Sequence, residues 1–237
     1  MLARRCQCAC GLLRFNVAAA GRHRSTHPAA YATSPLEKDR PAPTKERIAI
    51  IDLDPQHSAY VWHQKRGTDR PNVIEAAPDK LPKMIAAAED LGVTLVMIDT
   101  AGKIDHSTLA AMRQSDLIIV PVTACLFDHV ALQDTVKLLE MAGKKHAAIG
   151  VINQVPTKKL AQWVDETSVA IERFGLPIAD AYVRHHHDQF LEANNAGKGV
   201  TELKGKKMQA AAEDIRELWA CLTRIKTSAP KTKEVVR

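Results

Sequence analysis

RIAIIDLDPQ, residues 47–56, joins a run of branched aliphatic side chains to two acids and a proline. The run Ile48–Ile51 is apolar at every position, which is typical of a strand buried on both faces of a parallel sheet covered by helices. Asp52 and Asp54 follow at the carboxyl end of this strand, and Pro55 ends it. Ligands of open α/β sheets bind beyond these strand ends, so the two acids are candidates for handling a metal-bound anion. The alternative is that they only cap the next helix.

The rest of the chain alternates short apolar runs with amphipathic stretches, and its 237 residues are enough for one large α/β domain and a tail. The apolar runs predict strands, and the 3.6-residue periodicity of the longer stretches predicts helices. Strands are expected at 72–75, 94–99, 116–122, 147–153 and 181–183, and helices at 58–66, 79–91, 128–142, 158–173 and 210–222.

Two more of the expected strands end in a polar residue. The run 94–98 ends in Asp99, and a carboxylate at a rigid strand end can reach the shell of a magnesium ion, usually through a water. The alternative is that Asp99 caps the helix that starts near Asp105. Asn153 ends the strand 147–153, and its amide can both donate to and accept from a purine.

The segment Asp52-Leu53-Asp54-Pro55-Gln56 resembles switch I of the ParA/MinD-type partition ATPases. The resemblance continues through Trp62, Val120-Pro121-Val122 and the Gly197–Val200 block, and covers roughly residues 47–225. It implies a ParA-like nucleotide-binding domain over residues 47–226. The implied fold class is α/β, a doubly wound, mostly parallel sheet with helices on both faces, of the P-loop NTPase (ParA/MinD) type.

The same resemblance implies ATP and Mg²⁺ as cofactors and assigns roles to individual residues. Asp54 and Asp52 are expected to be catalytic, and Asp99 and Asp52 to hold the magnesium shell. Nucleotide contacts are expected from the positions that match the family's switch regions and adenine site: Asn153, Gly102, Pro55 and Gln56. Ala101-Gly102 departs mildly from the family, which more often has Pro-Pro or Pro-Gly there.

A cytoplasmic, nucleoid-associated partition protein is the function that the resemblance implies. Such a protein forms a nucleotide-dependent homodimer, binds DNA non-specifically and responds to a centromere-binding partner protein. The net charge of +6 and the isoelectric point near 9.1 favour a polyanionic partner. The first DNA-binding candidates are Lys204, Lys206, Lys207 and Arg216, and the second are Lys158 and Lys159; the alternative is a solvated charged face.

Residues 1–46 differ from the rest, because they are rich in arginine and contain no acid before Glu37. A mitochondrial presequence has this composition, but we favour a disordered or mistranslated leader. The leader contains no Gly-Lys-Ser or Gly-Lys-Thr, so the first strand and the P-loop (Walker A) of the family are missing or replaced. We expect a gap beside 48–51 and 95–98, unless residues 12–20 fill it.

The sequence also allows other functions. The missing P-loop favours a nucleotide-independent DNA-binding or partner-binding remnant, and the fold alone allows a MinD-like membrane-associated ATPase. We expect no membrane contact, because no run of eighteen apolar residues exists and the tail 227–237 is basic, polar and expected to be disordered. The three adjacent histidines at 185–187 are expected in a solvated loop.

Overall fold

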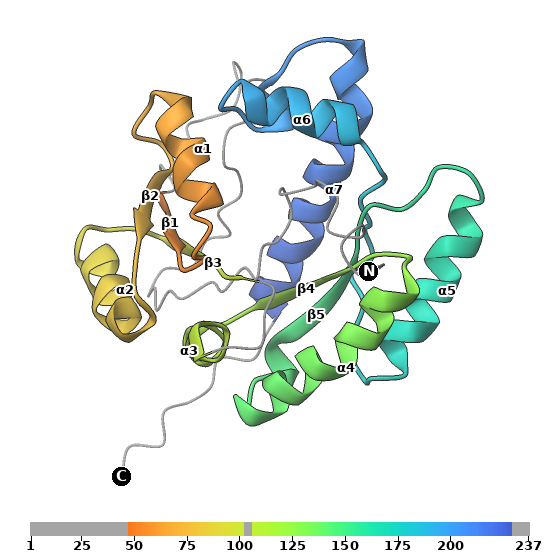
Figure 1. Ribbon diagram of the computed structural model, residues 1–237, viewed down its shortest axis with the longest axis horizontal. Helices are drawn as coiled ribbons and strands as arrows, with labels where there is room; N and C mark the ends of the chain where they lie inside the picture. Colours follow the sequence, from red (N-terminus) through yellow and green to blue (C-terminus); the bar gives the residue numbers. More distant parts are fainter. Residues whose placement is uncertain (1–46, 102–105, 229–237) are drawn as a thin grey trace, which may run out of the picture.

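The computed structural model of this chain describes residues 47–101 and 106–228, with their side chains up to 225. Its strands lie in the middle of the molecule, and the helices surround them (Figure 1). The predicted leader 1–46, Gly102 and residues 229–237 of the predicted tail lie outside the described residues.

Five parallel strands form the centre of the described fold, as predicted. β1 (Ile48–Asp52) lies between β2 (Asn72–Glu75) and β3 (Leu95–Asp99) in a three-stranded sheet. β4 (Ile118–Val122) and β5 (Ala148–Ile152) pair with each other. The bounds agree with the predicted strands to within two residues, because each strand is a nearly continuous apolar run.

Seven α-helices and three short 3-10 helices accompany the strands in the described residues. Four of the α-helices overlap the predicted ones closely, while α6 was not predicted as a helix. The α-helices are α1 (Ser58–Arg66), α2 (Leu81–Asp90), α3 (His106–Gln114), α4 (Leu126–Met141), α5 (Leu160–Glu172), α6 (His187–Asn195) and α7 (Lys206–Ser228). The 3-10 helices are η1 (Pro78–Lys80), η2 (Lys145–Ala147) and η3 (Val200–Glu202).

Successive side chains of a strand point to opposite faces of the sheet. Because these strands are apolar on both faces, helices cover both. In β3, Val96 and Ile98 pack into the cluster that includes Leu81 and Ile85 of α2, while Met97 packs toward Leu218 of α7. The same alternation in β4 and β5 separates the core under α4 and α5 from the core under α7. This is the doubly wound arrangement that the sequence predicts.

The strands do not form one continuous sheet within the described residues. No backbone pairing joins β3 to β4 there, although Met97, Ile119 and Trp219 line one apolar cavity of about 150 Å³ between β3, β4, β5 and α7. The gap expected beside β1 is not there, and the gap expected beside β3 stays a prediction, because residues 1–46 lie outside the described residues. The prediction for β1 is wrong because β2 and β3 occupy both edges of β1.

The last predicted strand, 181–183, does not form as a strand, and isolated bridges lie on either side of it. The chain runs along β5 through the pairs Gly150–Ile178 and Val155–Arg184, and the Val183 N–H donates to the Ile152 carbonyl at 3.0 Å. Pro177 lacks an N–H, which limits regular pairing in this segment. The segment still covers the outer side of β5.

Gly150 in β5 gives a test of this packing. A Cβ there would lie 2.7 Å from Ile171 Cγ2 of α5, so we expect Gly150→Ala to lower the free energy of unfolding by about 1–3 kcal/mol. Ile171→Ala should cost about 2–5 kcal/mol through the cavity that it opens. Denaturant titrations of both variants and the double variant should show that the double costs less than the sum by at least about 0.5 kcal/mol. Strict additivity would contradict this contact.

Candidate functional site

Asp52 and Asp99 end two neighbouring parallel strands and lie directly opposite each other in the register. Asp54 follows two residues after Asp52, and all three side chains are buried, with relative exposures of 0%, 7% and 8% for Asp52, Asp54 and Asp99. We call these three residues the carboxylate edge. The sequence predicted this grouping, because the carboxyl ends of parallel strands share one edge of the sheet.

Backbone N–H groups bind both oxygens of Asp52. The Asp54 N–H donates to Oδ1 at 3.0 Å, and the N–H of Tyr60, in the first turn of α1, donates to Oδ2 at 3.1 Å. A carboxylate in this position satisfies a helix N–H that has no partner inside the helix, and it interacts favourably with the helix dipole. Asp52 therefore caps α1, the alternative that the sequence left open, and this role does not exclude metal binding through the remaining lone pairs.

The turn after Asp52 holds the other switch-like residues. Asp54 Oδ1 accepts from the Gln56 N–H at 2.9 Å, and the His57 N–H donates to the Asp54 carbonyl at 2.8 Å. His57 has φ of 50°, a left-handed conformation that lets the chain turn sharply into α1. Pro55 and Gln56 are both exposed on this turn.

Asn153 lies on the other pair of strands. It follows β5, its N–H donates to the Val122 carbonyl at 2.8 Å, and its Oδ1 accepts from the Gln154 N–H at 2.9 Å. The side chain is 4% exposed and lines the apolar cavity beside Pro121. The structure thus places Asn153 at a strand end, as predicted, within a different sheet from the carboxylate edge.

The carboxylate edge has the donor type that magnesium prefers. Magnesium is usually held by one or two carboxylates, with waters and substrate phosphates completing an octahedron. Across residues 47–101 and 106–228, no group of three or more His, Cys, Asp or Glu side chains is arranged to hold a metal by itself. Asp52 and Asp99 on adjacent strands fit a magnesium ion that arrives with phosphates, and do not fit a metal held by protein ligands alone.

The predicted DNA-binding residues are all exposed, but their surroundings differ. Lys207 pairs with Glu192 at 3.0 Å, and Arg216 lies in α7 near two exposed acids, Glu213 and Glu217. Lys204 precedes α7, and Lys206 begins it. The second-choice pair, Lys158 and Lys159, is exposed before α5.

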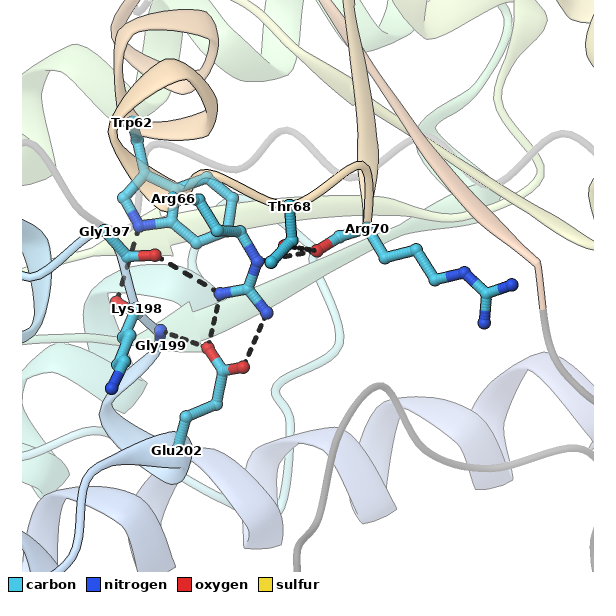
Figure 2. Close-up of polar contacts among 8 residues, drawn as sticks. All are labelled: Trp62, Arg66, Thr68, Arg70, Gly197, Lys198, Gly199 and Glu202. Carbon is cyan, nitrogen blue, oxygen red and sulfur yellow. Dashed lines mark hydrogen bonds and ion pairs between the residues drawn. The ribbon is translucent and has the colours of Figure 1, made fainter.

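A polar network that sequence reasoning missed joins α1 to the loop before α7 (Figure 2). Arg66 forms a two-pronged ion pair with Glu202, at 2.6 and 2.5 Å, and also donates to the carbonyls of Gly197 and Arg70. Its guanidinium lies 5.1 Å from the ring centroid of Trp62. We call this network the Arg66–Glu202 clamp. The one available signal was glycine at 197, which has φ of 63°.

The clamp shifts the titration of both partners. Hydrogen bonding to Arg66 is the main reason that the pKa of Glu202 lies below its ordinary value, with burial opposing it. Hydrogen bonding to Glu202 likewise raises the pKa of Arg66, against burial, which lowers it. Both groups therefore stay charged near neutral pH, where a bidentate pair is strongest.

A second network corrects the prediction for His186, one of the three adjacent histidines, while His185 is exposed outside the helices. His186 is not in a solvated loop: its Nε2 lies 2.9 Å from Asp214 Oδ2, and its side chain is 11% exposed. Arg184 binds the same carboxylate through its backbone N–H and its guanidinium. Burial alone would raise the pKa of Asp214, but the hydrogen bonds from Arg184 and His186 leave it lowered. The acid that orders these residues lies in α7, far along the chain, so local sequence could not show it.

Comparisons with known proteins agree on the type of fold. No family model matches the chain. The chain is 28% identical over 180 residues to "maintenance of carboxysome distribution protein A" of Gloeobacter kilaueensis, covering 73% of this chain and 79% of that protein. Among solved structures, the MinD cell division protein of Aquifex aeolicus superposes with a TM-score of 0.52 at 14% identity, over 79% of this chain and 87% of the other. A ParA family ATPase from Chlorobium tepidum gives a TM-score of 0.53 at 13% identity, over 75% and 86%.

Matched substitutions separate capping by Asp52 from a purely ligand-binding role. Asp52→Asn leaves one oxygen for two backbone donors, so a buried N–H loses its acceptor and unfolding should become easier by about 1–3 kcal/mol. Asp54→Asn keeps an oxygen for the hydrogen bond from the Gln56 N–H and should cost less than about 1 kcal/mol. Urea titrations measure both. Equal losses in the two variants would contradict the capping role.

Proposed function

We propose that this chain, which has the ParA/MinD-type fold, is a partition or positioning protein that works with a magnesium nucleotide. The observation that carries the proposal is the placement of Asp52 beside Asp99 at the ends of β1 and β3, with Asp54 on the adjoining turn. Acids so placed suit a magnesium ion bound to phosphates. The solved relative from Chlorobium tepidum, named as an ATPase, supports ATP as the nucleotide.

Each residue of the site has a proposed role. Asp99 and Asp52 hold the magnesium shell, and Asp54 positions the attacking water. Pro55 and Gln56, exposed on the turn, and Asn153, at the end of β5, contact the nucleotide. Gly102 keeps its proposed role near the γ-phosphate, although it lies outside the described residues. Bound magnesium would neutralise charge that develops on the transferred phosphoryl oxygens.

In this proposal, ATP binding and turnover are limited because the phosphate loop is missing. Residues 1–46 contain no Gly-Lys-Ser or Gly-Lys-Thr, and a triphosphate is ordinarily held by backbone N–H groups and a lysine. The carboxylates cannot replace those donors, because they repel the triphosphate unless magnesium arrives with it. We therefore propose weak ATP binding and slow turnover by the chain as written.

The proposed partners are a second copy of the chain, non-specific DNA and a partner protein that stimulates turnover. A centromere-binding protein is the partner expected of a DNA segregation system. The relative from Gloeobacter kilaueensis, whose name concerns carboxysome distribution, favours positioning of another cargo as a second candidate. We propose a cytoplasmic, nucleoid-associated location. None of the described helices is long and apolar enough to cross a membrane.

Two alternative functions are each favoured by one observation. The absent Gly-Lys-Ser/Thr motif favours a nucleotide-independent protein that only binds DNA or a partner. The likeness to the MinD structure favours a MinD-like ATPase of the same fold. A chain that binds no nucleotide would favour the first alternative over the main proposal. A chain that binds membrane rather than DNA would favour the MinD-like alternative.

Substitutions at the carboxylate edge test the roles, in a variant that carries the family's first strand, Lys-Gly-Gly-x-Gly-Lys-Thr loop and following helix ahead of Arg47. Asp54→Ala should bind magnesium ATP with wild-type affinity but lose turnover, by roughly 10²-fold or more, because the water is no longer positioned. Asp99→Ala should weaken the magnesium-dependent part of binding itself. Calorimetry and phosphate release measure the two effects. Unchanged turnover in Asp54→Ala would remove the role proposed for it.

A further inference from the structure

Helix α1 has no buried apolar face of its own. It contains nine residues, and none of them is buried. A helix of this length is marginal by itself in water, so its position depends on what the rest of the protein binds. The polar contacts at its two ends therefore decide where α1 lies.

The contact at the first turn of α1 orients Asp52. Tyr60 is the third residue of the helix, so its N–H has no acceptor inside the helix. Asp52 Oδ2 accepts from it instead, at 3.1 Å. A shift of α1 away from β1 would break this bond and free the carboxylate to rotate. The position of α1 thus sets the orientation of one of the two acids that end β1 and β3.

The contact at the last turn of α1 is the Arg66–Glu202 clamp, whose acid belongs to a well-packed part of the fold (Figure 2). Val200 of η3 is 4% exposed and packs with Met208 of α7. The Gly199 N–H also donates to Glu202 Oε2 at 2.7 Å, which holds this carboxylate in place independently of Arg66. The clamp therefore ties a weakly packed helix to a firmly packed one.

Backbone contact beside the clamp leaves α1 little room to move. A Cβ at Gly197 would lie 2.7 Å from the carbonyl carbon of Lys65 and from the backbone nitrogen of Arg66. The Trp62 Nε1–H donates to the Lys198 carbonyl at 3.4 Å. Any side chain larger than hydrogen at 197 would push α1 away from the segment that precedes α7.

We propose that Arg66 is a positioning residue for the carboxylate edge. Through Glu202 it fixes α1, and α1 presents the Tyr60 N–H that orients Asp52 toward magnesium. The inference rests on the magnesium-nucleotide function proposed above and names a residue outside the site on which that function depends. Removing a group that holds a metal ligand from behind commonly costs about 10- to 100-fold in metal affinity. Arg66 acts through a helix, so we expect the lower end of this range.

Amide hydrogen exchange in residues 1–237 tests the position of α1 without any ligand. The Tyr60 N–H should exchange roughly tenfold faster in Arg66→Ala than in the unchanged chain, because its bond to Asp52 opens more often. Arg66→Lys cannot make the two-pronged contact with Glu202 and should fall between the two. It also gives the same comparison if Arg66→Ala does not fold.

The magnesium dependence of ATP binding tests the effect on the site, in the variant with the phosphate loop restored. Arg66→Ala should need roughly tenfold more Mg²⁺ for half-maximal ATP binding, while ATP binding without Mg²⁺ stays the same. Gly197→Ala should shift both readouts in the same direction, because its methyl group displaces α1 while Arg66 is kept. The control Arg184→Ala removes another arginine–carboxylate pair, with Asp214 of α7, and should lower stability without changing either readout.

Faster exchange at Tyr60 together with the magnesium shift, in the Arg66 and Gly197 variants but not in Arg184→Ala, supports the proposal. Unchanged exchange at Tyr60 overturns it, whether or not the chain binds ATP. Faster exchange with an unchanged magnesium requirement also overturns it, because α1 would then move without affecting the site. If the loop-restored chain without further changes binds no magnesium ATP, the proposed function fails, and the role of Arg66 in it fails as well.

Discussion

The parallel register of β1 against β3 is the constraint on which the candidate site depends. It sets Asp52 opposite Asp99 at one edge of the sheet, although the two acids are separated in the chain by α1, β2 and α2. Two buried carboxylates so close together repel each other unless a cation or hydrogen-bond donors offset their charge. Backbone N–H groups from the turn and from α1 do this for Asp52, so the folding of the turn and the chemistry of the site use the same atoms.

Helix α1 connects the carboxylate edge to the C-terminal part of the fold. Its first turn binds Asp52 through the Tyr60 N–H, and its last turn binds Glu202 through Arg66. Helix α1 therefore links the carboxylate edge to the Arg66–Glu202 clamp, so the turn after β1 and the segment before α7 are held by the same helix.

The sequence was sufficient for the strands and the carboxylate edge, because apolar runs and the residues that end them are local signals. It was insufficient wherever a partner lay far away: Glu202 is 136 residues from Arg66, and Asp214 is 28 from His186. Apolar runs also do not specify which strands pair, so the edge of β1 was wrongly expected to border a gap. Pairing and ion-pair partners depend on tertiary packing, which a single sequence records only indirectly.

We propose that the carboxylate edge handles a magnesium nucleotide slowly, because residues 1–46 contain no Gly-Lys-Ser or Gly-Lys-Thr. The deciding measurement is magnesium-dependent ATP hydrolysis by residues 1–237 beside the variant with the loop restored. We expect turnover near background for the unrepaired chain and clear hydrolysis after restoration. Robust hydrolysis by the unrepaired chain that Asp54→Ala abolishes would contradict it.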